Sequence, residues 1–144
     1  LMLSTYGYVY VAKVALGANP EHFIKCLKEA AEHKGPSIVI AYAPCINHGI
    51  GGGMKKSIAE EKEAVECGFW PLYRYIPERE EQGLNPFVLD SKEPNGKIRD
   101  YMMNEVRFSS LTRTFPETAE KLFKEAEDQC MKRYEKYKRM AQDW

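Results

Sequence analysis

The chain has 144 residues, of which 44% are apolar and 29% charged, and its 21 basic and 21 acidic side chains leave no formal net charge. This length and composition are typical of one folded domain or part of one, and they exclude a mainly disordered chain. The balanced charge argues against proteins that bind nucleic acids or anionic membrane surfaces, because both classes depend on an excess of basic residues. The longest apolar run, residues 38–43, is too short to span a membrane, and no signal-peptide pattern opens the chain, so we expect a soluble, intracellular α/β protein.

The first part of the chain predicts a strand, a helix and a second strand. Residues 8–14 are rich in β-branched and aromatic side chains, which indicates a buried strand, and residues 37–42 have the same character. Between them, Asn19 and Pro20 are typical of a helix start, and the Gly-Pro pair at 35–36 ends the helix. This order and spacing predict a βαβ unit, with a parallel sheet and a right-handed crossover.

The first predicted helix has one apolar face and a histidine near each end. The face expected to pack on the sheet consists of Phe23, Ile24, Leu27, Ala30 and Ala31. His22 and His33 are interpreted as surface residues at the two helix ends.

A second helix is predicted after a glycine-rich loop. Ser57 and Glu60 have the spacing of a capping box, and Gly68 is typical of the position after a helix end. Glu60 and Glu61 are expected on the solvated face of this helix, with a capping role and no acid–base chemistry.

Short strands and a long helix follow. Residues 70–75 and 86–90 predict two short strands at the sheet edge, because nearby prolines disfavour a central position. Residues 98–104 fit either a short helix or another edge strand. Thr114 and Glu117 have the spacing of a second capping box, after which a helical period continues to about residue 140. The apolar positions of this period are Ala119, Leu122, Phe123, Ala126, Cys130, Tyr134 and Tyr137.

We therefore expect a single partial α/β domain over residues 1–144, in three parts. Residues 1–70 form a βαβ core that carries a loop with Cys45, and residues 71–113 form edge strands and turns. Residues 114–144 form a C-terminal helix, which we interpret as a packing or docking element.

The cysteines exclude the usual self-contained metal sites. Cys26, Cys45, Cys67 and Cys130 include no closely spaced pair of the kind that zinc and iron–sulfur sites take from one short loop. Three of them fall within helical patterns and are interpreted as small buried hydrophobic residues. Cys45 is different, because it lies in the glycine-rich loop that follows the second strand.

This loop, residues 43–54, is the one segment with residue types suited to chemistry, and ligands of parallel α/β sheets bind at the carboxyl ends of strands. The first interpretation is a stand-alone phosphate- or nucleotide-binding module, although the spacing fits neither a P-loop nor a dinucleotide fingerprint. Its amides would come from Gly49, Gly51, Gly52 and Gly53. The second is a nucleophile pair of Cys45 and His48, for which the sequence identifies no orienting acid. The third is ligation of a metal or iron–sulfur cluster by Cys45, with the other ligands elsewhere.

Six segments of the sequence, taken in order, resemble the thiamine-diphosphate-binding domain of the pyruvate:ferredoxin (flavodoxin) oxidoreductases. They are YGYVYVA at 6–12, ALGAN at 15–19, PSIVIAYAPCINHGI at 36–50, EEKEAV at 60–65, GFWPLYRY at 68–75 and NPFVLDSKEP at 85–94. The match covers nearly the whole chain without large gaps. The resemblance implies a Rossmann-like fold and places the chain in the carboxyl-terminal part of that domain.

The resemblance also implies a reaction and its cofactors. Family members oxidatively decarboxylate pyruvate on thiamine diphosphate with Mg²⁺, transfer the acetyl group to coenzyme A, and pass electrons through 4Fe–4S clusters in anaerobic metabolism. Cys45 matches the family's cysteine that holds an iron of the cluster nearest the thiamine. His48 is a candidate for tuning the potential of that cluster or for moving protons, and Asn47 is a second candidate beside it; the alternative for both is a hydrogen bond to the loop backbone. No catalytic residue is implied within this chain.

In the family, the other cluster cysteines and the Gly-Asp-Gly motif for Mg²⁺ and diphosphate lie upstream of the position of Leu1. The resemblance therefore implies a fragment that is inactive alone. The implied partners are the rest of the same polypeptide, ferredoxin or flavodoxin, pyruvate, coenzyme A and a second copy in a homodimer, with no nucleic acid and no membrane. The implied location is the cytoplasm or a hydrogenosome-like organelle.

Overall fold

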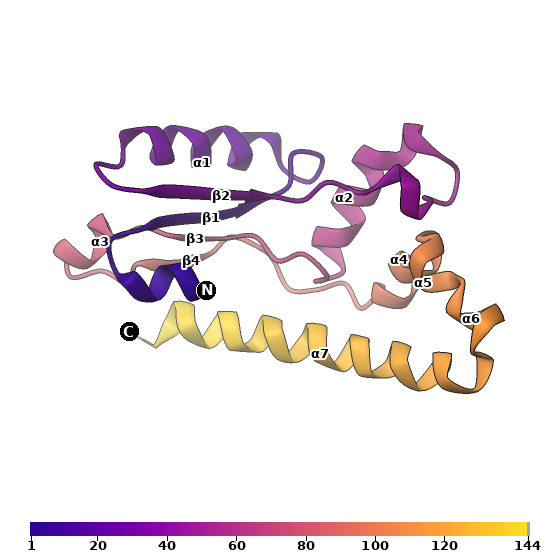
Figure 1. Cartoon of the computed structure of the whole chain (residues 1–144). Helices are drawn as coiled ribbons and strands as arrows, with labels where there is room; N and C mark the ends of the chain where they lie inside the picture. The colour runs from indigo at the N-terminus through magenta and orange to yellow at the C-terminus, as the bar shows by residue number, and fades with distance from the viewer. Residues whose placement is uncertain (144) are drawn as a thin grey trace.

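A four-stranded mixed sheet lies between helices on its two faces, as Figure 1 shows for this computed structural model, which describes residues 1–143. The strands are β1 (Tyr10–Val14), β2 (Ser37–Ala41), β3 (Tyr73–Tyr75) and β4 (Phe87–Leu89). Their order is β2-β1-β3-β4, with β1 parallel to β2 and β3 antiparallel to both of its neighbours. The predicted α/β class is confirmed, and the parallel pairing is limited to β1 and β2.

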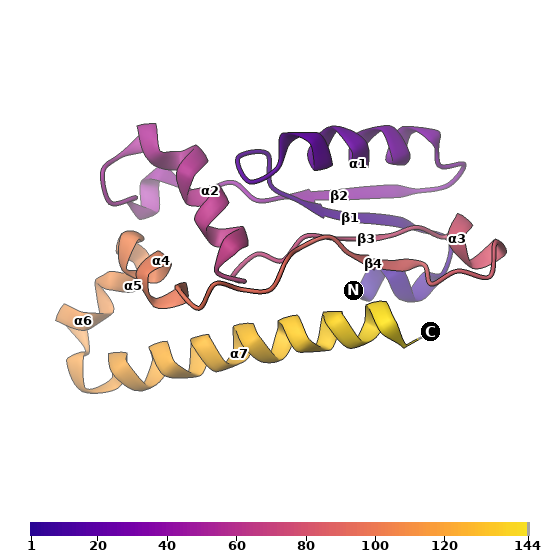
Figure 2. The ribbon, with the colours of Figure 1, turned by 180° about the vertical axis from the view of Figure 1, so that it is seen from behind.

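Helices cover both faces of the sheet. The helical elements of the described residues are α1 (Pro20–Glu32), α2 (Ser57–Glu66), α3 (Glu78–Glu81), α4 (Ile98–Asn104), α5 (Val106–Ser109), α6 (Leu111–Thr114) and α7 (Pro116–Gln142), with 3-10 turns η1 (Met2–Tyr6), η2 (Ile46–His48) and η3 (Met54–Lys56). α1 lies on one face, and α7 runs along the other (Figure 2). Residues 98–104 form a helix and not an edge strand. Among residues 1–143, no helix is long and apolar enough to cross a membrane.

The predicted βαβ unit is confirmed. β1 and β2 pair in parallel over their whole length, and α1 connects them. α1 begins as predicted, because the side-chain oxygen of Asn19 accepts a hydrogen bond from the backbone N–H of His22 at 2.9 Å, and Pro20 follows in the first turn.

Strand β1 is buried on both faces, and one core cluster lies on each face. A third core cluster lies among the helices. The cluster toward α1 consists of Tyr10, Ala12, Val14 and Cys26. The cluster toward the end of α7 consists of Val9, Val11, Tyr73, Phe87 and Tyr137. The third cluster joins α2, α4 and the first half of α7 and consists of Ala64, Cys67, Ile98, Tyr101, Met102, Ala119, Phe123 and Cys130.

The predicted inner face of α1 is partly wrong. Ile24 and Leu27 are 52% and 45% exposed, whereas His22 and Cys26 are buried against the sheet. Residues four apart lie on one side of a helix, so the pair His22 and Cys26 defines the inner side and Ile24 and Leu27 fall on the opposite side. The apolar residues of α1 are therefore spread around the helix, and their pattern alone does not identify the packed side.

β3 lies inside the sheet, between β1 and β4, although its sequence predicts an edge strand. The prediction is wrong because the ladders of β3 and β4 are only three residues long, and Pro71, Pro77 and Pro86 all lie outside them. A proline outside the ladder removes no ladder hydrogen bond. β4 is an edge strand as predicted, and β2 forms the other edge.

α2 begins where predicted but without the capping box. The hydroxyl of Ser57 donates to a carbonyl of turn η3 at 2.7 Å, and Glu60 is only 3% exposed, which also contradicts a solvated face. Glu61 is buried too, and its carboxylate accepts a hydrogen bond from the N–H of Gly17 at 2.8 Å. A side chain at Gly17 would lie 2.6 Å from the carbonyl oxygen of Ile58, so the close approach of α2 to the end of β1 requires glycine.

α7 confirms the predicted long helix, of which Trp144 lies outside the described residues. The second capping box is wrong, because the hydroxyl of Thr114 donates to the Ser110 carbonyl at 2.7 Å and no side chain caps the helix start. The buried positions of α7 are Ala119, Phe123, Cys130, Tyr134 and Tyr137. Leu122, predicted on the same face, is 42% exposed.

Two neighbouring truncations test which side of α7 is packed. Phe123 is 2% exposed, so Phe123→Ala is expected to lower the free energy of unfolding by about 3–5 kcal/mol through lost burial and the cavity left behind. Leu122 is 42% exposed, so Leu122→Ala is expected to cost about 1 kcal/mol or less. Urea denaturation of both variants, followed by circular dichroism, measures the difference. Equal losses would contradict this register of α7.

Candidate functional site

The loop after β2 presents Cys45, Asn47 and His48 together at the carboxyl end of that strand. Cys45 occupies the N-cap position of turn η2 without a side-chain capping bond, the turn contains Asn47 and His48, and all three residues are exposed. The N–H groups at the start of such a turn have no acceptor within the turn. The loop therefore offers one accessible thiol beside free backbone donors, an amide and an imidazole.

The loop alone does not form a complete metal site. Within the part of the chain that the structure describes, no group of three His, Cys, Asp or Glu side chains converges to hold a metal ion. The thiol–imidazole contact in the structure joins Cys26 to His22, with Sγ 3.5 Å from Nε2, and involves neither Cys45 nor His48. Cys45 is thus an exposed thiol without a convergent set of His, Cys, Asp or Glu side chains among the described residues.

The other three cysteines are core residues, as predicted. Cys26, Cys67 and Cys130 are buried in α1, at the end of α2 and in α7. Burial raises the pKa of the Cys67 thiol to about 11 and also raises that of Cys130. Since metals and clusters are held by thiolates, Cys67 and Cys130 are poor ligands. Cys45 is the exposed one of the four cysteines.

Glu105 contacts both ends of the Cys45 loop. At the start of the loop, the hydroxyl of Tyr42 donates to Glu105 Oε1 at 3.0 Å. At the end of the loop, Ile50 pairs with Glu105 in an antiparallel backbone bridge. Both Glu105 and Ile50 are buried, at 3% and 8% exposure.

The carboxylate of Glu105 has further partners that hold it in place. The hydroxyl of Tyr101 donates to Oε1 at 2.9 Å, the guanidinium of Arg107 forms an ion pair with Oε2, and the hydroxyls of Tyr42 and Tyr101 contact each other. Burial raises the pKa of Tyr42 to about 12, and burial together with Tyr42 raises that of Tyr101 further. Both phenols therefore stay protonated at neutral pH, and each has one proton to donate, either to the carboxylate or to the other hydroxyl.

Two backbone hydrogen bonds flank the pairing of Ile50 with Glu105. The N–H of Gly51 donates to the Asn104 carbonyl at 2.6 Å, and the N–H of Val106 donates to the Gly49 carbonyl at 2.9 Å. Gly49 has a φ of 77°, and a side chain there would lie 2.7 Å from a methyl carbon of Val106. Glycine at this position thus allows the positive φ and the close approach of the loop to the side chain of Val106.

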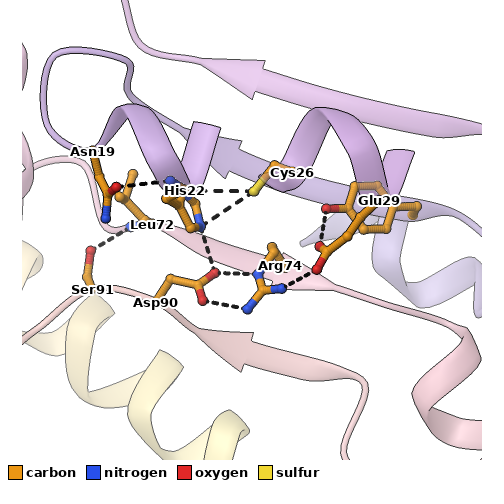
Figure 3. A network of polar contacts seen from close by, with 9 residues as sticks. Asn19, His22, Cys26, Glu29, Leu72, Arg74, Asp90 and Ser91 are labelled. Atoms are coloured by element: carbon orange, nitrogen blue, oxygen red, sulfur yellow. Dashed lines mark hydrogen bonds and ion pairs between the residues drawn. The ribbon is translucent and has the colours of Figure 1, made fainter. Parts of the chain in front are cut away.

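A second polar network, which the sequence did not predict, joins α1 to β3 and the end of β4 (Figure 3). Arg74 donates to both oxygens of Asp90, at 2.9 and 2.8 Å, and to Glu29 Oε1 at 2.6 Å. His22 Nε2 lies 2.9 Å from Asp90 Oδ2, and the hydroxyl of Tyr10 donates to Glu29 Oε2 at 2.8 Å. His22 is only 8% exposed, so its predicted surface position is wrong.

The charges of this network are mutually compensated. Burial opposes protonation of His22, but the hydrogen bond to Asp90 and the contact with Cys26 outweigh it and raise the pKa of His22 to about 9. Burial works against the charged form of Asp90 as well, yet His22 and Arg74 lower its pKa below the usual value. With each charge paired, we interpret the network as a structural link and not as a reactive site. The one available signal was Arg74 in a strand of aromatic residues, where a buried cation needs acidic partners.

A hollow of about 840 Å³ lies at the opposite end of β1 from the Cys45 loop, beside Tyr8, Pro36 and Pro77. The imidazole of His33 borders it and is held by Glu78 Oε1 at 2.5 Å and by the Tyr8 carbonyl at 3.0 Å, and its side chain is 8% exposed. The side chain of His33 therefore lies between Tyr8 and helix α3, although its sequence position suggests the surface. The hollow is distant in the fold from the residues predicted to carry chemistry.

Comparison with known proteins finds relatives along almost the entire chain. It is 53% identical over 142 residues to the pyruvate:ferredoxin oxidoreductase of Moorella thermoacetica, which covers 99% of the chain and 12% of that protein. It is 49% identical over 141 residues to the pyruvate-flavodoxin oxidoreductase of Enterobacter agglomerans, which covers 98% of the chain and 12% of that protein. A mitochondrial NADP(+) pyruvate dehydrogenase of Euglena gracilis is 38% identical over 98% of the chain and 8% of its own length. No family model matches the chain.

The chain is therefore homologous to one segment of pyruvate oxidoreductases of this kind, and the resemblance seen in its motifs is confirmed. It spans only 12% of the length of the first two relatives.

Replacing His22 tests whether its positive charge stabilises the network with Asp90 and Arg74. In the unfolded chain the pKa of a histidine is about 6.5, and folding raises that of His22 to about 9. The stabilisation from protonated His22 is then complete below pH 6.5 and is lost as the pH rises through 9, with a slope of at most about 1.4 kcal/mol per pH unit. Urea denaturation between pH 6 and 10 should show this decline in the wild type and in the exposed control His48→Gln, and not in His22→Gln. A decline of the same size in His22→Gln would contradict the link.

Proposed function

We propose that this chain, a homologue of one segment of the pyruvate:ferredoxin and pyruvate-flavodoxin oxidoreductases, is the carboxyl-terminal part of the thiamine-diphosphate-binding domain of such an enzyme. We further propose that Cys45 is the one ligand that it contributes to a 4Fe–4S cluster. The observation that carries the proposal is an exposed thiol at the carboxyl end of a parallel strand, in a chain that aligns with these enzymes over 99% of its length.

The donor set of the chain fits a shared cluster. Such a cluster is held by about four cysteine thiolates, of which this chain has one in an accessible position. The remaining ligands then come from residues outside the 144 described by this sequence. Cys45 would bind an iron, the N–H groups at the start of η2 suit the sulfur atoms as acceptors, and the side chains of Asn47 and His48 lie beside them in the same turn.

The cluster, when bound, accepts and releases electrons one at a time. In the proposed reaction, pyruvate and coenzyme A yield acetyl-coenzyme A, CO₂, a proton and two electrons, which leave singly for ferredoxin or flavodoxin. Thiamine diphosphate with Mg²⁺ would supply the bond-breaking chemistry, and its main ligands would lie outside this chain. The role of this chain is to build part of the domain and to hold Cys45, and alone it is inactive.

The proposed partners follow from the same homology. They are the rest of the polypeptide, pyruvate, coenzyme A, ferredoxin or flavodoxin, and a second copy of the full-length enzyme in a homodimer, without nucleic acid or membrane. The proposed location is the cytoplasm, or a hydrogenosome-like organelle in an anaerobic eukaryote. The Euglena relative is named as mitochondrial, which supports the organelle as one of the two proposed locations.

Cys45→Ser in the full-length enzyme tests the ligand assignment. The variant is expected to lose about four iron atoms and four sulfides per chain and the reduction of ferredoxin, because a serine hydroxyl is a poor substitute for a thiolate. Iron and acid-labile sulfide are assayed on the anaerobically purified protein. Cys130→Ala, which removes a buried thiol, is the control and should keep its iron. Wild-type iron and activity in Cys45→Ser would contradict the assignment.

The alternative function, a stand-alone phosphate- or nucleotide-binding module that uses the loop from Gly49 to Gly53, predicts that the chain alone binds a ligand. Gly52 and Gly53 have φ values of 93° and 81°, and Lys56 lies over Gly52, so a phosphate-binding loop would be disrupted by Gly52→Val. If the chain is such a module, the 144 residues alone bind inorganic phosphate or ATP in calorimetric titrations, and Gly52→Val abolishes the binding. We expect no binding by either form. Binding that Gly52→Val removes would favour the module over the enzyme segment.

A further inference from the structure

We infer that Glu105 is the positioning residue of the Cys45 loop: it holds the two ends of the loop together and so determines where the thiol of Cys45 lies. This inference rests on the proposed function of Cys45, and it adds a residue that ligates nothing itself. It is supported by contacts at each end of the loop, by the exposure of the loop between them and by the burial of Glu105.

The first attachment is at the end of β2. The N–H of Tyr42 donates to the Val14 carbonyl at 3.0 Å, so the pairing of β2 with β1 continues as far as Tyr42. The hydroxyl of the same residue reaches Glu105 Oε1 at 3.0 Å. Tyr42 thus connects the sheet to Glu105 immediately before the loop begins.

The second attachment is made by the backbone. Ile50 pairs with Glu105, and hydrogen bonds from Gly51 to Asn104 and from Val106 to Gly49 flank the pair at 2.6 and 2.9 Å. Residues on both sides of Glu105 therefore take part. The loop leaves the sheet beside the side chain of Glu105 and ends beside its backbone.

Between these attachments, residues 43–49 have no buried side chain, and Cys45 is near the middle. An exposed loop with few packing contacts has little to fix its conformation except the closure of its ends. A metal ligand on such a loop depends on that closure for its position, just as ligating side chains depend on the groups that orient them.

Glu105 is suited to this role because its own position is fixed. It is 3% exposed, and Tyr101 and Arg107 hold its two oxygens from α4 and α5. Hydrogen bonds to a buried carboxylate are stronger than those between neutral groups, and removing one partner leaves the other unsatisfied. The attachment therefore resists thermal opening of the loop.

Four variants of the full-length enzyme test the inference. Tyr42→Phe removes only the hydroxyl, Glu105→Gln keeps the size of the side chain and removes its charge, and the double variant combines them. Tyr137→Phe, which removes a hydroxyl from a buried tyrosine of α7 at the other end of the sheet, is the matched control. The readouts are the rate of iron release to an iron(II) chelator under anaerobic conditions and the electron paramagnetic resonance spectrum of the reduced clusters.

Iron release from one cluster is expected to be about tenfold faster in Tyr42→Phe and Glu105→Gln than in the wild type, the usual size of such orienting effects. The double variant should be no faster than the more affected single variant, because both changes open the same attachment. The spectrum of that cluster should change, whereas Tyr137→Phe should match the wild type in both readouts.

Two other results would separate the ligand role of Cys45 from the positioning role of Glu105. If Cys45→Ser keeps all its iron, the proposed function of Cys45 is wrong. If Cys45→Ser loses a cluster while Tyr42→Phe and Glu105→Gln release iron at the wild-type rate with the wild-type spectrum, Cys45 is a ligand and the positioning role of Glu105 is wrong, even where the variants melt at a lower temperature.

Discussion

Strand β1 is buried on both faces, and the rest of the sheet and the helices on its two faces are arranged around it. β2 and β3 pair with it, α1 packs on one of its faces, and the end of α7 packs in the cluster on the other. At its carboxyl end, the carbonyl of Val14 accepts hydrogen bonds from the N–H of Tyr42 and from the indole of Trp70, both at 3.0 Å. The segment that begins the Cys45 loop and the segment that leads into β3 therefore meet at one atom of β1.

Local signals predicted much of this fold, and their failures share a physical cause. Asn19 and Pro20 start α1 as expected, and Gly68, with a φ of 83°, follows the end of α2. The capping boxes failed because the hydroxyls of Ser57 and Thr114 bond to carbonyls three and four residues earlier, an alternative of equal reach that sequence spacing does not exclude. Which side of α1 is packed, and where β3 lies in the sheet, depend on distant elements and not on local pattern.

In the candidate site, too, local pattern predicted some features and contacts between distant residues determined the others. The exposed position of Cys45 after a parallel strand follows from the strand–helix–strand pattern and the glycines. The residues that contact the ends of its loop do not follow from the pattern, because Tyr42 and Glu105 are 63 positions apart and Glu105 lies outside the segments that carry the family resemblance. His22 and Asp90, separated by 68 positions, were missed for the same reason. Burial of a charged residue was the only common sign, and burial is known only once the chain is folded.

The outer edge of β2 affects how copies of the isolated chain associate. β2 is the five-residue segment SIVIA, it has no charged residue or proline, and in the described part of the chain it pairs with β1 alone. Its Ile40 is 38% exposed. An uncharged, apolar edge with free backbone groups is a template for strands of other molecules, and natural proteins usually block such edges with charge, proline or a covering segment. Copies of the isolated chain should therefore join through β2 into aggregates, and a covering strand or a lysine on this edge would keep them apart.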